Sequence, residues 1–170
     1  VGWLIWHATA DLDEIEARTL ELNSVAALAW EHLVLVLISA LLVIATAIPL
    51  GILLTRQSTQ FLAPVVTGIA NIGQAAPVVG VIVLLAIWLG FGTPVAILGL
   101  WFYAFLPVLA NVIAGLRGVD KQLIEAAYGL SMSPMQVLAK VELPLALPVI
   151  MTGVRTSLVL LVGAGAFATF

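Results

Sequence analysis

Three stretches without a single charged residue constrain the fold of this chain more than any other feature of its sequence. They cover residues 33–55, 57–116 and 156–170. A run of about 20 apolar residues is long enough to cross a bilayer as an α-helix. Helices are the expected form because backbone amide and carbonyl groups find no water at that depth. The chain is 63% hydrophobic and 9% charged, and we predict an all-α, polytopic membrane protein.

The basic residues predict how many times the middle stretch crosses the membrane. Lys and Arg in short loops favour the cytoplasmic side. Arg56 precedes residues 57–116, and Arg117, Lys121 and Lys140 follow them. If all four basic residues are cytoplasmic, the stretch between them crosses an even number of times, and we expect two crossings.

Glycine and proline residues between positions 89 and 94 favour a tight turn between these two crossings. We therefore expect about four spanning helices that form a bundle, the last of them starting after Pro148. Their expected limits are residues 32–55, 63–89, 94–115 and 148–170.

The acidic residues gather near the N-terminus, where residues 1–31 contain six acidic residues and one basic residue. The rest of the chain has five basic and three acidic residues. This asymmetry indicates two different aqueous faces rather than a nucleic-acid partner. We expect residues 1–31 to form an external segment and residues 32–170 to form the membrane domain. The apolar start VGWLIWHATA is interpreted either as the end of an earlier membrane helix or as the tail of a signal peptide.

A more polar segment, residues 117–147, interrupts the apolar sequence, and we call it the elbow. Asp120 is a candidate N-cap for a helix over residues 121–129. Residues 133–136 (SPMQ) have the spacing of a capping box with proline at the first helical position. Pro144 lacks an amide hydrogen and is expected to end or kink the helix that contains it. We predict two short helices joined by a turn on the cytoplasmic side.

The elbow resembles the EAA loop of ABC-importer permeases. The family pattern is Glu-Ala-Ala, three residues, Gly, nine residues, Ile, one residue and Leu-Pro. Five of the seven pattern positions match, at Glu125, Ala126, Ala127, Leu143 and Pro144. The other two differ, with Ser131 in place of Gly and Val141 in place of Ile. The resemblance implies that these residues dock in a groove of a separate ATP-hydrolysing subunit. Because Ser replaces Gly, we expect Gly129 to supply the conformational freedom of the turn.

The surrounding sequence resembles the osmoprotectant branch of these permeases, which import glycine betaine, choline, carnitine and related quaternary amines. The stretches NIGQAAPVVGVIVLLAIWLGFGTP and KVELPLALPVIMTGVRTS carry this resemblance, which extends from about Glu31 to Phe170. It implies the type I importer fold and at least one further helix in whole family members. It also implies a multi-pass protein of the cell (inner) membrane of a bacterium or archaeon. It also implies three protein partners, namely an ATP-binding subunit, a second permease chain, identical or homologous, and an external solute-binding protein. A permease for an amino acid such as methionine, and a membrane scaffold that transports nothing, are the alternatives.

The chain lacks the sequence features of an enzyme. No Gly-rich phosphate loop of the GxxxxGK[ST] kind occurs, so ATP and Mg²⁺ are expected on the partner subunit and no cofactor on this chain. His7 and His32 have no ligand-spaced partners, so we expect no metal site, and no catalytic Ser/His/Asp arrangement is present.

A translocation path for a polar solute needs polar groups at membrane depth, where they are costly unless they face the bundle interior. The candidates are Asn71, Gln74, Trp101, Tyr103 and Asn111. Asn71 and Gln74 are three residues apart on one helical face, and the two aromatic rings offer faces for a quaternary ammonium group. For all five, hydrogen bonding or packing between helices is the alternative role. Arg155 is expected about 10 Å into the last helix, either snorkelling to the inner surface or taking part in gating.

Overall fold

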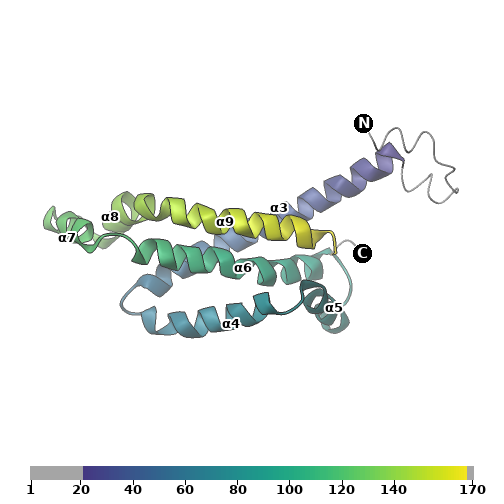
Figure 1. The fold of residues 1–170 in the computed structure, drawn as a ribbon, viewed down its shortest axis with the longest axis horizontal. Coiled ribbons are helices and arrows are strands. Elements are labelled where there is room, and N and C mark those ends of the chain that lie inside the picture. Colours follow the sequence, from purple (N-terminus) through teal and green to yellow (C-terminus); the bar gives the residue numbers. More distant parts are fainter. Residues whose placement is uncertain (1–20, 168–170) are drawn as a thin grey trace.

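The computed structural model describes residues 21–167, and every regular element in this range is a helix. In chain order these elements are α3 (Leu22–Thr55), η1 (Gln60–Leu62), α4 (Ala63–Ala75), α5 (Val78–Leu89), α6 (Thr93–Arg117), α7 (Lys121–Gly129), α8 (Pro134–Val137), the π-helical turn η2 (Leu138–Glu142) and α9 (Leu143–Gly165). Figure 1 shows α3, α6 and α9 along the long axis of the molecule, with α7 and α8 projecting at one end. The predicted all-α helix bundle is confirmed.

Helix α6 forms the centre of the bundle because it contacts α3, α4, α5 and α9. The six consecutive residues Ala104 to Leu109 are all buried, as expected for an apolar helix that is surrounded by others. Val43 of α3 and Leu161 of α9 are fully buried in the same core. The bundle therefore holds α3 and α9 against different parts of one central helix.

Two glycines let the outer helices approach α6 closely. A Cβ atom at Gly153 of α9 would lie 2.6 Å from the Pro107 carbonyl oxygen and 2.7 Å from the Asn111 Cβ. At Gly51 of α3, a Cβ atom would lie 2.5 Å from Cγ1 of Val112. Such distances are below any ordinary carbon contact, so only glycine permits this packing between membrane helices.

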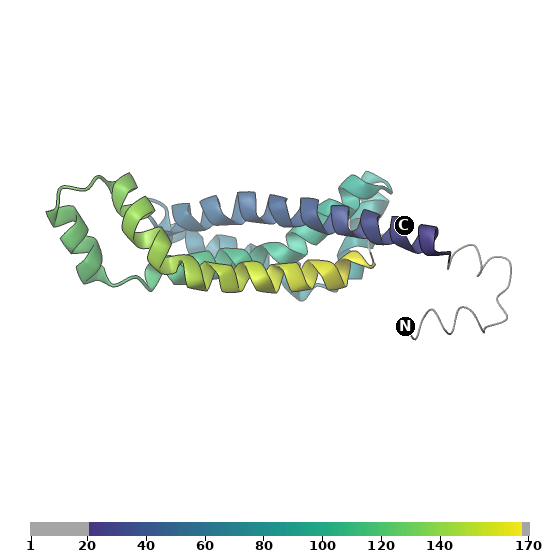
Figure 2. The same ribbon diagram turned by 90° about the horizontal axis from the view of Figure 1, so that it is seen from above.

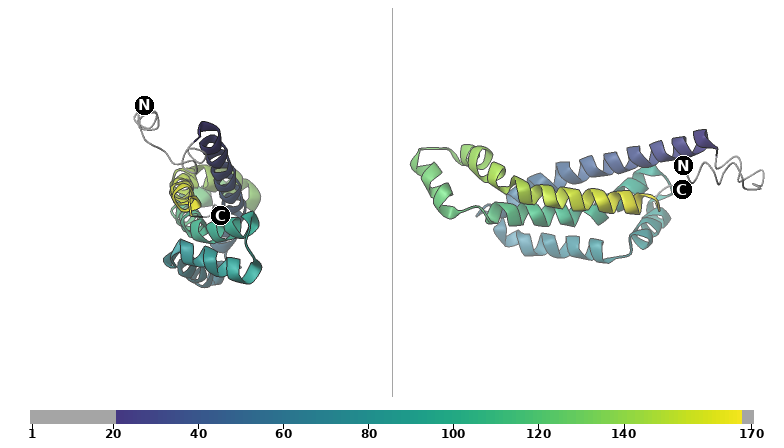
Figure 3. Two further views of the ribbon diagram at one scale, coloured as in Figure 1. Left: turned by 90° about the vertical axis from the view of Figure 1, so that its right-hand side faces the viewer. Right: turned by 45° about the horizontal axis from the view of Figure 1, so that its top comes forward.

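The predicted continuous helix over residues 63–89 is wrong, because the chain breaks at Ala76 and Pro77. Ala76 is extended, with φ −70° and ψ 142°. Proline has no amide hydrogen and disfavours the helical conformation of the preceding residue, which explains the break. The result is two helices of 13 and 12 residues, and Figure 3 shows α5 turned away from the axis of α4. Neither is long enough to cross a bilayer by itself.

Three helices of the described residues are long and apolar enough to span a membrane. Together, α4 and α5 lead from the elbow end of the bundle back to the start of α6 and so form an interrupted fourth crossing (Figure 1). The first span begins at Leu22, ten residues before its expected start, and has 34 residues. Part of the expected external segment is therefore helical, and the expected earlier helix or signal peptide lies outside the described residues.

Candidate functional site

Each leg of the elbow begins at a helix cap that the sequence predicts. The Asp120 carboxylate accepts a hydrogen bond from the Gln122 backbone amide at 2.9 Å and starts α7. The Ser133 hydroxyl accepts from the Gln136 amide at 3.4 Å, and the Gln136 side-chain oxygen accepts from the Ser133 amide at 2.8 Å. Both caps are confirmed, and Figure 2 shows the two legs of the elbow, α7 and α8, meeting beyond the bundle.

The turn between the legs depends on Ser131 rather than on Gly129. Ser131 is the only non-glycine residue with a positive φ in the described part of the chain, at 60°. Gly129 is the last residue of α7 and has no positive φ. The expectation that Gly129 supplies the freedom of the turn is therefore wrong. Ser131, which has the left-handed conformation, occupies the Gly position of the EAA pattern. A glycine there would avoid the steric cost of a Cβ atom.

Replacing Ser131 by Gly should stabilise the elbow by about 0.5–1 kcal/mol, because glycine adopts a left-handed conformation without strain. Ser131→Ala is the matched control, since it removes the hydroxyl but keeps the Cβ atom. Amide hydrogen exchange of α7 in the purified protein measures the effect. Slower exchange in Ser131→Gly only is the expected result, and equal exchange in both variants would contradict it.

The second leg of the elbow is continuous with the last membrane helix. Residues 134–165 form one 32-residue helix through α8, η2 and α9. Pro144 lies in the first turn of α9 and Pro148 inside it, so Pro144 does not end the helix and the last span does not start after Pro148. The π-helical turn changes the hydrogen-bonding register just before Pro144, which has no amide hydrogen to donate. The second leg of the elbow and α9 are therefore one continuous rod of helix.

An ion pair joins the same turn to the first membrane helix. The Arg56 Nη2 atom lies 2.5 Å from Oε2 of Glu142, and Nη1 lies 3.3 Å from Oε1. Glu142 is 7% exposed, and the Arg56 side chain is one third exposed. Sequence reasoning used Arg56 only for topology and missed this contact. It fixes the C-terminal end of α3 to η2, so the elbow is attached to two spans.

Removing one partner of this pair should destabilise the protein by about 2 kcal/mol, since a buried carboxylate loses its counter-charge. We expect Arg56→Gln to lower the thermal unfolding temperature of the purified protein. Glu125→Gln is the matched control, because Glu125 is exposed on α7 and its neutralisation should leave that temperature unchanged. If both variants unfold together with the unaltered protein, the pair contributes nothing to stability.

The structure brings the two halves of the EAA pattern together in one groove. This elbow groove has a volume of about 360 Å³ and is lined by Leu123, Ala126, Ala127, Leu130, Met132, Lys140, Val141, Pro144 and Leu145. Glu125 is exposed on the same helix, Leu143 is half-buried, and Ser131 forms the turn. Four of the seven pattern residues thus line one surface although they come from both legs.

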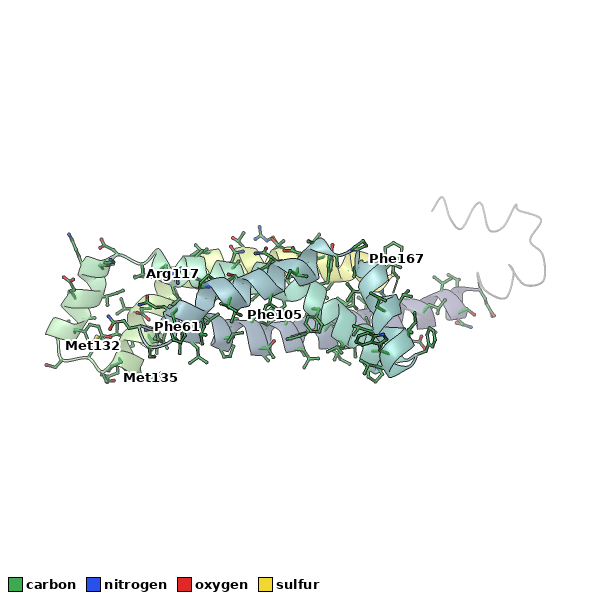
Figure 4. The ribbon with its side chains drawn as sticks, turned by 90° about the horizontal axis from the view of Figure 1, so that it is seen from below. Phe61, Phe105, Arg117, Met132, Met135 and Phe167 are labelled. Atoms are coloured by element: carbon green, nitrogen blue, oxygen red, sulfur yellow. The ribbon has the colours of Figure 1, made fainter. Side chains whose placement is uncertain are left out.

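Large apolar side chains are exposed around the elbow groove. Leu130 is 79% exposed and Met135 is 71% exposed, and Figure 4 places Met132 and Met135 at the elbow end, far from Phe167. An exposed apolar surface of this kind, next to charged residues, marks a contact site for another protein or for lipid.

The candidate path residues occupy three different environments. Asn71 is exposed and Gln74 half-buried at the end of α4, beside the break. The Trp101 indole donates a hydrogen bond to the Thr46 hydroxyl at 2.9 Å. The Asn111 amide donates to the Pro107 carbonyl of its own helix at 2.8 Å. Tyr103 packs against the core. Among these five residues, Asn71 and Gln74 are the two that lie three positions apart on one helix, α4.

Comparison with known proteins agrees with this architecture. Residues 47–170 match the family model described as binding-protein-dependent transport system inner membrane component. The choline transport system permease protein OpuBB of Bacillus subtilis is 42% identical, over 83% of this chain and 64% of that protein. The glycine betaine/carnitine/choline permease protein OpuCB of Bacillus subtilis is 41% identical, over 82% of this chain and 64% of that protein.

The osmoprotectant import permease protein OsmY of Salmonella typhimurium is 37% identical, over 92% of this chain and 65% of that protein. The chain therefore spans less than two thirds of the length of these relatives. Among solved structures, an inward-facing conformation of the MetNI methionine ABC transporter matches with a TM-score of 0.69 and 29% identity, over 81% of this chain and 69% of that chain. The expected type I importer fold is confirmed. The chain belongs to the family of binding-protein-dependent transport system inner membrane components.

Proposed function

We propose that the chain is a membrane-spanning permease subunit of an ATP-driven importer for small zwitterions or quaternary amines such as glycine betaine. The observation that carries this proposal is the elbow groove, in which both halves of the EAA pattern meet at one end of the bundle. The sequence relatives named for choline, glycine betaine and carnitine support the solute class. They are more similar to this chain than the structurally matched methionine transporter.

The partners follow from the same assignment. A separate ATP-binding subunit, which carries ATP and Mg²⁺, docks at Glu125, Ala126 and Ala127 on the cytoplasmic side. A second permease chain completes the enclosure of the path, because so few helices are not expected to enclose one alone. An external binding protein delivers the solute at the opposite end, where α3 begins.

The proposed mechanism uses the two connections of the elbow. ATP binding brings the two ATP-binding subunits together, and each pulls the elbow docked on it. Because η2 continues into α9 and Glu142 holds Arg56, the pull moves α9 and the inner end of α3 as one unit. This rigid-body motion opens the path outward, and hydrolysis resets it.

The path residues are proposals of the same assignment. Asn71 and Gln74 are the first candidates, because polar side chains at membrane depth are costly unless they meet water, protein or solute. Trp101, Tyr103 and Asn111 already contact the described bundle and are the weaker candidates.

Uptake into proteoliposomes tests the proposed function. The full permease is reconstituted with its ATP-binding subunit and its binding protein, and uptake of labelled glycine betaine, choline, carnitine and methionine is measured with ATP or ADP inside. ATP-dependent uptake of one or more quaternary amines is expected. Uptake of methionine alone would favour the amino-acid alternative, and no uptake of any solute would favour the scaffold.

A further inference from the structure

Arg155 lies near the middle of the last membrane helix. Leu143 begins α9 and Gly165 ends it, so Arg155 is about 18 Å from the start and about 15 Å from the end at the usual helical rise. The expectation of about 10 Å was too short because the helix begins before Pro148. The packing of Gly153 on Pro107 gives the same depth, since Pro107 lies about 15 Å from the end of α6 at Arg117.

No group in the described part of the chain balances this charge. The Arg155 side chain is exposed and forms no hydrogen bond or ion pair among residues 21–167. Arg155 is about 20 Å along the helix from Glu142, which already pairs with Arg56. The other acidic residues in this range lie in the elbow, at the N-cap of α3 or in the first half of α3. An unpaired arginine at the centre of a bilayer is costly, so we expect a group outside residues 21–167 to meet it.

The side of α9 that carries Arg155 holds both polar and apolar exposed side chains. Thr152, Arg155 and Thr156 are all exposed and share one side of the helix by their spacing. The Thr152 and Thr156 hydroxyls donate to the Pro148 and Thr152 carbonyls at 3.1 and 3.0 Å, which leaves their oxygen lone pairs free to accept. Met151 and Val162 are exposed on the same side, at helical spacings of four and seven residues from Arg155. Arg155 is the charged residue of this side, and a charge at this depth is costly unless it meets water, solute or another protein.

We propose that Arg155 binds the carboxylate of the transported solute near the middle of the path. A guanidinium group pairs with a carboxylate through two parallel hydrogen bonds, a geometry that a hydroxyl group cannot reproduce. This inference rests on the proposed function and narrows it to solutes that carry both a carboxylate and a quaternary ammonium, such as glycine betaine and carnitine. Choline has no carboxylate, and its positive charge is repelled by Arg155.

A carboxylate from a neighbouring permease chain could pair with the Arg155 guanidinium in the same way. In a pair of identical chains, residues 21–167 supply no such carboxylate at the required depth, because none of their acidic residues lies at the middle of a span. A solute that carries a carboxylate supplies this group.

The test compares solutes with and without a carboxylate in the reconstituted complex. Arg155→Gln and the charge-keeping Arg155→Lys are assayed for KM and maximal rate of glycine betaine, carnitine and choline uptake, with an unaltered ATP-binding subunit and binding protein. We expect Arg155→Gln to raise KM for glycine betaine and carnitine about tenfold or more, with partial recovery in Arg155→Lys. Choline uptake should stay equal or increase, and an Arg155→Glu variant should favour choline further.

The outcomes separate this inference from the proposed function. An equal loss for all three solutes would overturn it in favour of a carboxylate from the neighbouring chain or of a structural role. Unchanged KM values for every solute would overturn it in favour of an arginine that meets lipid headgroups. If the unaltered complex takes up none of these solutes, the proposed function fails, and the carboxylate assignment fails with it.

Discussion

Replacing Gly153 by valine is expected to prevent α9 from packing on α6 and to lower strongly the amount of folded protein. Even a single Cβ atom at this position would lie 2.6 Å from the backbone oxygen of Pro107. The Pro107 oxygen is held by the backbone of α6 and cannot shift as a flexible side chain would, so the two helices must separate. Overpacking of this kind costs about 3 kcal/mol or more. Thermal unfolding of the purified protein and its amount in the membrane fraction measure the effect.

Gly163→Val is the matched control because it makes the same change in the same helix. A Cβ atom at Gly163 would have no heavy atom of a neighbouring element within 4 Å, so the added side chain meets open space. We expect this variant to unfold at the temperature of the unaltered protein. If Gly153→Val were equally stable, the close packing of α6 and α9 would be wrong.

Reversing the charge of Glu125 is expected to reduce solute uptake at least about tenfold without loss of folded protein. Glu125 is exposed on α7, so its replacement by arginine removes no contact within the described bundle. In the complex, we expect Glu125 to pair with a basic group of the ATP-binding subunit. Arginine at this position would repel that group, and like charges across an interface cost several kcal/mol. ATP hydrolysis should then proceed without uptake, which is measured as solute transported per ATP hydrolysed in proteoliposomes.

Ser58→Arg serves as the control for Glu125→Arg. Ser58 is exposed between α3 and η1 at the same end of the bundle, outside the EAA pattern. The same arginine there should leave uptake per ATP unchanged. Similar losses in both variants would indicate a general effect of charge at this end rather than a specific contact of Glu125.

The parts of the fold that were predictable from the sequence depend on local rules. The Asp120 cap and the capping box at Ser133 each involve residues within three positions of one another, so their spacing alone indicates them. The elbow and its two helix starts follow from these caps. The positive φ of Ser131 is also local, and the EAA pattern marks this position with glycine, but proximity to Gly129 suggested the wrong residue.

The parts that were not predictable depend on distant contacts or on competing effects of proline. Arg56 and Glu142 are 86 residues apart, and no local pattern connects them. Pro77 breaks its helix whereas Pro107 and Pro148 lie inside theirs, because neighbouring helices determine whether the missing hydrogen bond is tolerated. The depth of Arg155 depends on where α9 begins, and the continuation through η2 could not be recognised from Pro144 alone.

The orientation and contact of the elbow are tested most directly by a single introduced cysteine. The sequence contains no cysteine, so an Ala126→Cys thiol is the only one in residues 1–170, and Ala126 is exposed and lines the elbow groove. We predict that a membrane-impermeant maleimide labels it in inside-out vesicles only, and that the assembled ATP-binding subunit protects it. Labelling from the external side, or equal labelling with and without that subunit, would contradict a cytoplasmic elbow that couples ATP hydrolysis to transport.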